Sequence, residues 1–207
     1  MAFSVCQNEE KAKNDYNANI VKIMKETESK KLIPFQFKPD VVIGIDPDNK
    51  ESGVGIVWRE TKRVEAFKFS FPKLVDYLRE EKNLGQSILI VVEGGWLNES
   101  NWHIKAATKY VRDPLARAAS IGRSTGMNAQ TGILIAEMCD HLEIPCTIQK
   151  PLKKCWRGAD GKITQIELQG IIGSGQKLPR MNQDERDALL LAWVYADLPI
   201  RVSNSVK

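Results

Sequence analysis

Four acidic residues stand where their carboxylates could act together on a divalent cation. Asp46 and Glu93 each end a short apolar run of the kind that forms a buried β-strand, and Asp184 and Asp187 open a helical stretch. A carboxylate at the end of a buried strand costs several kcal/mol of desolvation unless a positive charge offsets it. Divalent cations such as Mg²⁺ prefer oxygen ligands. The four residues therefore predict a metal site.

The helical pair has the spacing that a shared ion needs. Residues at i and i+3 lie on one helix face, so Asp184 and Asp187 can point toward the same cation. Asn182 fits an N-cap with Glu185 at the third helical position, which would put both aspartates where the helix dipole stabilises negative charge. The alternative is a pair of ordinary first-turn acids, which are common.

The strand-end acids also have simpler explanations. Asp46 precedes Pro47 and could serve only the turn, and Glu93 could be a solvent-facing strand terminus. Glu93, however, is followed by Gly94 and Gly95, which allow a ligand or another backbone to approach closely. Acids from three separate segments together favour a two-metal site, with Asp46 as the expected bridging ligand. Two cations about 4 Å apart suit hydrolysis of a phosphodiester.

The spacing of apolar residues predicts a mixed α/β fold. Expected strands cover 41–46, 53–58, 64–69, 88–93 and 144–148, with the first three antiparallel. Expected helices cover 72–81, 162–172, 183–196, and 115–142 with an alternative break near Gly126. Residues 8–31 indicate an extra N-terminal amphipathic helix, followed by a linker that contains prolines. We expect a helical extension and linker at 1–39 and an α/β domain at 40–207.

The composition excludes several protein classes. Of the 207 residues, 43% are hydrophobic and 27% are charged, as in a soluble globular protein. No run approaches the roughly 18 apolar residues of a membrane span, and the N-terminus lacks the pattern of a signal peptide. The four cysteines show no CxxC spacing, which argues against zinc. We expect reduced cysteines and a cytoplasmic protein without membrane contact.

Basic residues concentrate in one part of the chain. Residues 104–180 contain 12 Lys and Arg against 6 Asp and Glu, whereas the net charge of the whole chain is +4. This distribution fits a polyanionic partner, and an ordinary solvated surface is the alternative. Basic side chains would neutralise phosphates, and aromatic rings would stack on unpaired bases. The candidate DNA-binding residues are Lys150, Lys153, Lys154, Trp156, Arg157, Arg123, Trp96 and Trp102.

Taken in order, these segments resemble the motifs of RuvC-type Holliday junction resolvases in the RNase H-like superfamily. The likeness spans approximately residues 41–197. Its motifs are Gly44-Ile45-Asp46-Pro47, Gly53-Val54-Gly55, Val91-Val92-Glu93 with Trp96, Gly132-Ile133-Leu134-Ile135-Ala136 with Leu142-Glu143-Ile144-Pro145, Gly161-Lys162, and Asp184-x-x-Asp187-Ala188-Leu189. Each motif is weak alone, and the series is specific for the superfamily more than for junction resolution.

The resemblance implies an RNase H-like mixed five-stranded sheet flanked by helices. It also implies a homodimer that nicks four-way DNA junctions with two Mg²⁺ ions per active site, for which Mn²⁺ can substitute. The implied catalytic residues are the metal ligands Asp46, Glu93, Asp184 and Asp187 and a basic helper at Lys162.

Two features of the chain depart from the family or add to it. Asp48 and Asn49 stand where the family usually has glycine, and residues 1–38 have no counterpart. Trp96 follows two glycines and precedes polar residues, so we expect it in an exposed loop rather than in the core. An exposed ring there could wedge into an opened junction, as an aromatic residue does in the resembling family.

We expect a Mg²⁺-dependent, structure-selective DNA endonuclease that resolves Holliday junctions. Two alternatives stay open: an RNase H-like nuclease acting on another branched or hybrid nucleic acid, and a catalytically inactive junction-binding protein. Gly44-Ile45-Asp46 followed by a glycine-bearing strand also occurs in sugar kinases and actin-like ATPases. Those proteins need a duplicated domain, for which the residues after Asp40 are too few.

Overall fold

The computed structural model describes residues 38–98, 112–173 and 175–200. The chain divides between residues 37 and 38, and every described residue belongs to the second part. The helix predicted at 8–31 and Trp102 lie outside the described residues. The predicted boundary after residue 39 stays a prediction.

The described elements alternate much as the apolar pattern predicts. The strands are β1 (Val41–Asp46), β2 (Ser52–Trp58), β3 (Val64–Phe69), β4 (Ile88–Glu93) and β5 (Cys146–Gln149). The α-helices are α2 (Phe71–Asn83), α4 (Pro114–His141), α5 (Gln165–Ile172) and α6 (Gln183–Tyr195). Short 3-10 turns lie at η1 (Gly95–Leu97) and η2 (Ala159–Gly161). Three strands, β1, β3 and β4, have the predicted bounds.

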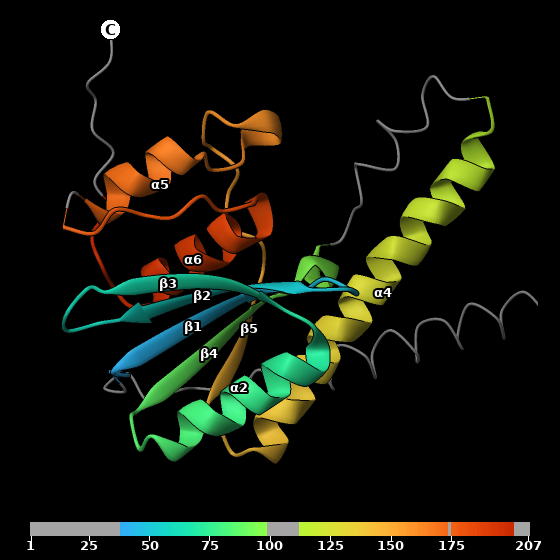
Figure 1. The fold of residues 1–207 in the computed structure, drawn as a ribbon. Helices are drawn as coiled ribbons and strands as arrows, with labels where there is room; N and C mark the ends of the chain where they lie inside the picture. The colour runs from blue at the N-terminus through green and yellow to red at the C-terminus, as the bar shows by residue number, and fades with distance from the viewer. Residues whose placement is uncertain (1–37, 99–111, 174, 201–207) are drawn as a thin grey trace, which may run out of the picture. The chain divides into compact units, whose positions relative to one another are not determined.

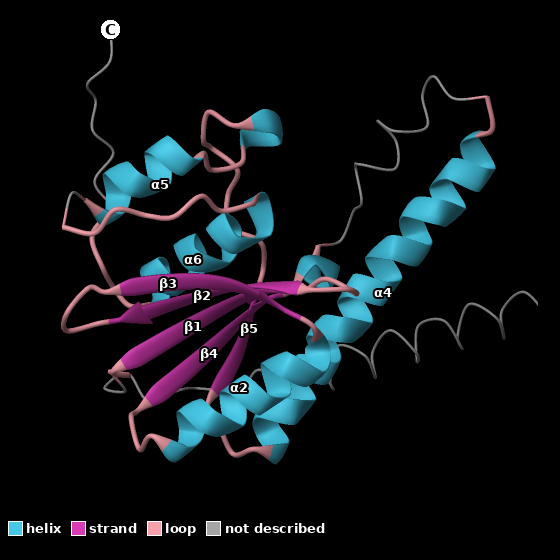
Figure 2. Cartoon of the chain, viewed as in Figure 1, coloured by secondary structure: helices cyan, strands magenta, loops and turns pink. Residues whose placement is uncertain are grey.

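The strands form one mixed sheet in the order β3-β2-β1-β4-β5 (Figures 1 and 2). β1, β2 and β3 pair antiparallel, whereas β4 is parallel to both β1 and β5. The crossover through α2 brings β4 back in the same direction as β1, so β4 pairs parallel with β1. This arrangement confirms the predicted RNase H-like sheet.

Helices cover both faces of the sheet, because side chains alternate between the faces along each strand. The core on one face combines Ile43, Ile45, Ile90 and Val92 of the central strands with residues of α2 and α4, among them Leu74. The other face of β1 and β2 packs against α6. α5 contacts α6 on the same side (Figure 1). A sheet covered on both faces explains why β1 and β4 are apolar without alternation.

The prediction of one long helix after residue 114 is confirmed, and one helix start is predicted wrongly. α4 runs unbroken through Gly126, so the alternative break is absent, because a single glycine costs a helix only about 1 kcal/mol. α5 begins at Gln165, so Lys162 precedes the helix instead of opening it. The Thr164 hydroxyl accepts the backbone N–H of Glu167, and the Glu167 carboxylate accepts that of Thr164. This capping box fixes the start of α5.

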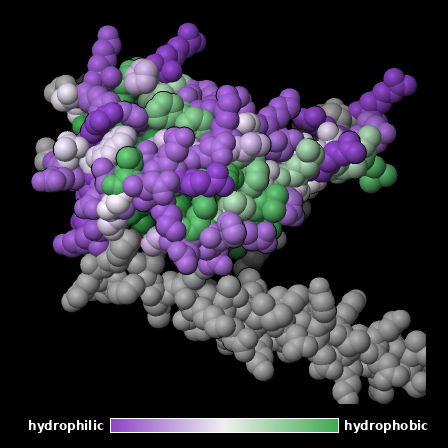
Figure 3. Space-filling view, turned by 60° about the horizontal axis from the view of Figure 1, so that its bottom comes forward, coloured by the Kyte–Doolittle hydropathy of each residue, from purple (hydrophilic) through white to green (hydrophobic). Residues whose placement is uncertain are grey.

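The first half of α4 extends beyond the sheet (Figure 1). The buried residues of α4, Gly132, Ile135, Ala136 and Cys139, all lie in its second half. Leu115, in its first turn, is 83% exposed. One face of the molecule is mostly hydrophilic with small hydrophobic groups (Figure 3). Within the described ranges, no helix has the length and apolar character needed to cross a membrane.

Candidate active site

Asp46 and Glu93 end neighbouring parallel strands. The β1–β4 register pairs Ile45 with Val92, so the next residue on each strand places the two acids side by side. Ile45 and Val92 belong to the core on the α2 and α4 face. Asp46 and Glu93 therefore point to the opposite face, which α6 covers.

Three glycines, Gly44, Gly53 and Gly55, allow α6 to lie directly on the sheet. A Cβ added at Gly44 would lie 2.2 Å from the carbonyl oxygen of Ala188, and one added at Gly53 would lie 2.4 Å from that of Asp184. Gly53 pairs with Asp46 across β1 and β2. Since side chains at these positions would hold the helix away, the glycines bring the first turns of α6 next to Asp46.

The start of α6 is fixed by the predicted cap. The Asn182 side chain accepts the backbone N–H of Glu185 at 3.0 Å, and the Glu185 carboxylate accepts the backbone N–H of Asn182 at 2.7 Å. This capping box puts Asp184 in the first turn of α6 and Asp187 on the next, on the side that meets the sheet ends. The helix dipole favours negative charge at this end.

The helical acids have polar partners. Gln183 donates to Asp187 at 2.7 Å, and the Lys162 ammonium lies 3.8 Å from the other oxygen of Asp187. The Lys68 ammonium of β3 lies 3.1 Å from Asp184. Sequence reasoning missed Lys68, because only the pairing of β2 with β3 places it there.

The strand-end acids have no such partners. Among the described residues, no side chain donates a hydrogen bond to Asp46 or Glu93, and neither forms an ion pair there. Both side chains are nevertheless half-buried. An ionised carboxylate removed from water without a donor or a counter-charge is unfavourable. The lysines near this pair are too far away to form ion pairs with it, so the two negative charges are only partly balanced.

Burial and mutual repulsion raise the pKa values of these acids. The pKa of Asp46 lies well above its usual range, mainly because of burial and then because Glu93, Asp184 and Asp187 carry negative charge. Burial, followed by the charge of Asp187, raises the pKa of Glu93 to about 7, while nearby lysines act in the opposite direction. Burial also raises the pKa of Asp187. A bound cation would favour the ionised form of all three.

These observations test whether divalent cations fit the site. The donor set consists of carboxylate oxygens, which Mg²⁺ and Mn²⁺ prefer, and its negative charge at Asp46 and Glu93 is only partly balanced. In the described part of the chain, no three Asp, Glu, His or Cys side chains already converge as a cation would require. The oxygen ligands suit a divalent cation. To join the metal site, Asp184 and Asp187 would have to give up their ion pairs with Lys68 and Lys162.

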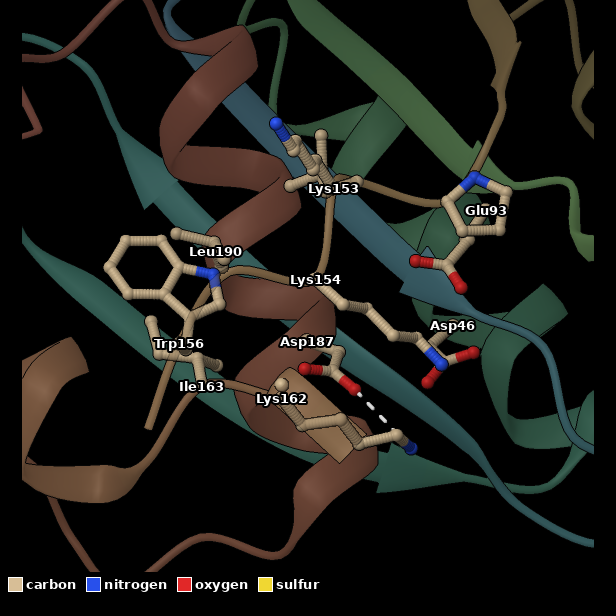
Figure 4. A pocket seen from close by; sticks show the side chains of 12 residues that line it. Asp46, Glu93, Lys153, Lys154, Trp156, Lys162, Ile163, Asp187 and Leu190 are labelled. Atoms are coloured by element: carbon tan, nitrogen blue, oxygen red, sulfur yellow. Dashed lines mark ion pairs between the residues drawn. The ribbon is translucent and has the colours of Figure 1, made fainter. Parts of the chain in front are cut away.

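A pocket brings together three of the acids and part of the predicted DNA-binding set. Its lining includes Asp46, Glu93, Asp187, Lys153, Lys154, Trp156 and Lys162. Figure 4 shows the three carboxylates turned toward one space, into which the chains of Lys154 and Lys162 extend. Asp184, Lys150 and Arg157 do not line it. The pocket therefore contains both charges: the acids lie on the sheet and on α6, and the lysines lie on the segment between β5 and α5.

A groove leads from Asp46 and Glu93 along α4. Its α4 wall consists of Arg117, Ser120, Ile121, Ser124, Thr125, Asn128 and Ala129. None of these residues is among the candidate DNA-binding residues of the sequence analysis, although positions 117, 120, 124 and 128 follow the spacing of one helix face. Arg123, the predicted residue, is exposed but does not line the groove. Hydroxyl, amide and guanidinium groups on this wall can donate hydrogen bonds to phosphates.

Trp96 differs from the expectation of an exposed loop. It lies in η1, is half-buried and packs against the core. A Cβ added at Gly132 of α4 would lie 2.4 Å from the Trp96 ring and 3.1 Å from Pro47. The absence of a side chain at Gly132 gives the ring a surface to pack on, which no local pattern around Trp96 indicated. The ring still lines the groove.

No protein-family model matches the sequence, and no curated protein matches it. Among solved structures, the chain is similar to T. thermophilus RuvC in complex with a Holliday junction substrate. The identity is 19% and the TM-score 0.45, covering 75% of this chain and 92% of that chain. It is also similar to a Thermus thermophilus RuvC structure, at 17% identity and a TM-score of 0.43, covering 75% and 93%. Likeness at this level concerns the fold alone, which the strand order and pairing make RNase H-like.

Proposed function

We propose that this protein is a divalent-metal-dependent, structure-selective DNA endonuclease. The observation that carries the proposal is the pair formed by Asp46 and Glu93: two half-buried carboxylates side by side, without a hydrogen-bond donor or an ion pair among the described residues. Asp187 lines the same pocket from α6. A fold needs no such unbalanced pair for its own stability, so a charged ligand is the simplest reason for it.

Asp46, Glu93, Asp187 and Asp184 would hold Mg²⁺ or Mn²⁺, with Asp46 central because it lies between β4 and the start of α6. Two such cations supply activation of the attacking water and stabilisation of the leaving oxygen in phosphodiester hydrolysis. Lys162 lies at the rim of the site, paired with Asp187. It is positioned to neutralise a phosphate once that pairing is exchanged.

The groove supports a nucleic-acid substrate. Lys153 and Lys154 stand on one side of the acids, and Arg117 with polar residues of α4 stands on the other. A DNA backbone that runs between these two sets of side chains would meet positive charge and hydrogen-bond donors on either side of the acids. Within this class, the resemblance of the sequence motifs to those of RuvC-type resolvases supports a four-way junction as the substrate and a homodimer as the active form.

The test compares a four-way DNA junction with linear duplexes and an RNA–DNA hybrid of the same sequences. We expect the wild-type protein to cut the junction in Mg²⁺ or Mn²⁺. Asp46→Asn and Glu93→Gln should abolish cutting and leave junction binding, measured by gel shift in Ca²⁺, intact. Cutting that survives in EDTA or in either variant would defeat the proposal. Binding without cutting by the wild-type protein would instead identify an inactive junction-binding protein, and preferred cutting of the hybrid would change the substrate class.

A further inference from the structure

Asp184 differs from the other three acids in its position and in its ion pair with Lys68. Asp46, Glu93 and Asp187 line the pocket, and Asp184 does not. Its carboxylate instead lies 3.1 Å from the ammonium of Lys68. Asp184 thus has the shorter of the two ion pairs in the set, since the Lys162 ammonium lies 3.8 Å from Asp187.

The sheet register explains how Lys68 reaches this carboxylate. Lys68 pairs with Gly53, and Gly53 pairs with Asp46, so the three positions form one row across β3, β2 and β1. The first turn of α6 rests on Gly53, with the backbone of Asp184 directly above it. Asp184 therefore sits between a lysine on one side and Asp46 on the other.

The ion pair is weak enough to exchange. The side chains of Lys68 and Asp184 are 32% and 37% exposed, and water screens a pair of that kind. The charge of Asp184 also reaches Asp46, whose pKa it helps to raise. A cation in the pocket and the Lys68 ammonium would therefore compete for the same carboxylate.

We propose that Lys68 is a positioning residue that holds Asp184 out of the pocket and opposes its joining the metal ligands. The inference rests on the proposed function, since it assumes that the pocket takes a divalent cation. Lys68 then lowers the metal affinity of the free protein. When a metal binds, Asp184 would give up its ion pair with Lys68 and become a ligand of the metal.

The test measures Mn²⁺ binding to the full chain by calorimetry and by electron paramagnetic resonance, without DNA. Lys68→Met and Lys68→Gln should tighten Mn²⁺ binding about two- to fivefold, the range that loss of a partly exposed ion pair allows. Lys73→Met is the matched control, because it removes the same charge from an exposed position on α2, on the other face of the sheet. It should leave the affinity unchanged.

A double-mutant cycle shows whether Lys68 acts through Asp184. In an Asp184→Asn background, Lys68→Met should no longer change Mn²⁺ affinity, and the resonance spectrum should not respond to it. An equal gain in both backgrounds, or an equal gain in Lys73→Met, would show a general charge effect and overturn the inference. Unchanged affinity in both Lys68 variants would overturn it as well.

The two failures are distinguishable. If the wild-type protein does not bind Mn²⁺, or if the Asp46→Asn variant binds Mn²⁺ as tightly as wild type, the proposed function is overturned and this inference with it. Wild-type binding that depends on Asp46 but not on Lys68 would overturn the inference alone. Weaker junction binding by Lys68→Met with unchanged Mn²⁺ affinity would identify Lys68 as a phosphate contact instead.

Discussion

Asn128 of α4 holds the turn that follows Asp46. Its side-chain oxygen accepts the backbone N–H of Asn49 at 3.1 Å, and its amide nitrogen donates to the Asp48 carboxylate at 3.4 Å. Asp48 also accepts the backbone N–H of Lys50 at 2.9 Å, so it closes its own turn. Asp48 and Asn49 thus connect the acid site to the wall of the groove.

Asn128→Ala should therefore reduce cleavage more than binding. The change removes both bonds that Asn128 makes to the turn, and we expect the free energy of unfolding to fall by only about 1 kcal/mol because the contacts are partly exposed. The turnover number for junction cleavage should fall, with a smaller change in junction affinity. Asn128→Asp should be worse, since it loses the donor and places a negative charge beside Asp48. Gln130→Ala, at an exposed position of α4, is the control, and an equal effect there would contradict a role for the link.

Gly44→Ala and Gly126→Ala should have opposite effects on stability. The first substitution puts a Cβ 2.2 Å from the Ala188 carbonyl oxygen, whereas nothing lies within 4 Å of a Cβ at position 126. We expect Gly44→Ala to lower the free energy of unfolding by about 3 kcal/mol or more and to disturb metal binding, because α6 must move. Gly126→Ala should raise it by about 0.5–1 kcal/mol. Urea unfolding measures both values, and equal values would show that α6 does not rest on the sheet as described.

Glu93→Gln should make the metal-free protein more stable at alkaline pH. The pKa of Glu93 is about 7 in the folded chain, above its ordinary value of 4.5, so the folded state binds this proton more tightly than the unfolded state. Ionisation of Glu93 therefore destabilises the fold progressively as pH rises from about 4.5 through 7. At pH 8 the variant should gain about 1–3 kcal/mol over wild type, and at pH 4 the two should agree.

Thermal unfolding without divalent cations, measured from pH 4 to pH 8, tests this expectation. Glu80→Gln removes the same charge at an exposed position and is the control. Added Mg²⁺ should stabilise the wild type increasingly as pH rises, because the proposed ligands are the ionised carboxylates. It should not stabilise Glu93→Gln. A constant difference between variant and wild type across the pH range would contradict the raised pKa.

Trp96→Ala should affect both stability and substrate choice. The ring packs against Gly132 and the core, so we expect a loss of about 2 kcal/mol in the free energy of unfolding, less than for a fully buried tryptophan. The ring also lines the groove, and cutting of branched DNA should fall more than cutting of linear DNA. Rates are compared at a temperature where both proteins are folded. Equal loss on both substrates would reject the wedge and leave only the packing role.

The fold could be predicted because its signals are local. β1 and β4 are continuous apolar runs that end in an acid, and the carboxyl ends of parallel strands meet at one edge of a sheet. The predicted cap at Asn182 is confirmed, because the capping box depends on neighbours along the chain. Three of the acids consequently meet in one pocket, as their spacing indicated.

The features that sequence did not reveal depend on partners far away in the chain. Lys68 is an ordinary strand lysine until β3 pairs with β2 and α6 lies across Gly53. Trp96 seemed exposed because its neighbours are small or polar, yet its packing surface belongs to Gly132. The α4 wall of the groove has no unusual composition, and it becomes a wall only when α4 is placed beside the acids.

Because α6 contacts the sheet through main-chain atoms, the position of its acids does not depend on the packing of the core on the opposite face. At Gly44, Gly53 and Gly55 the sheet contacts main-chain atoms of α6, whose positions do not depend on side-chain rotamers. Repacking of Leu74 or Ile135, in the core on the opposite face, would leave these contacts unchanged. The core on that face is thus free to change during evolution, provided that Gly44, Gly53 and Gly55 keep no side chain.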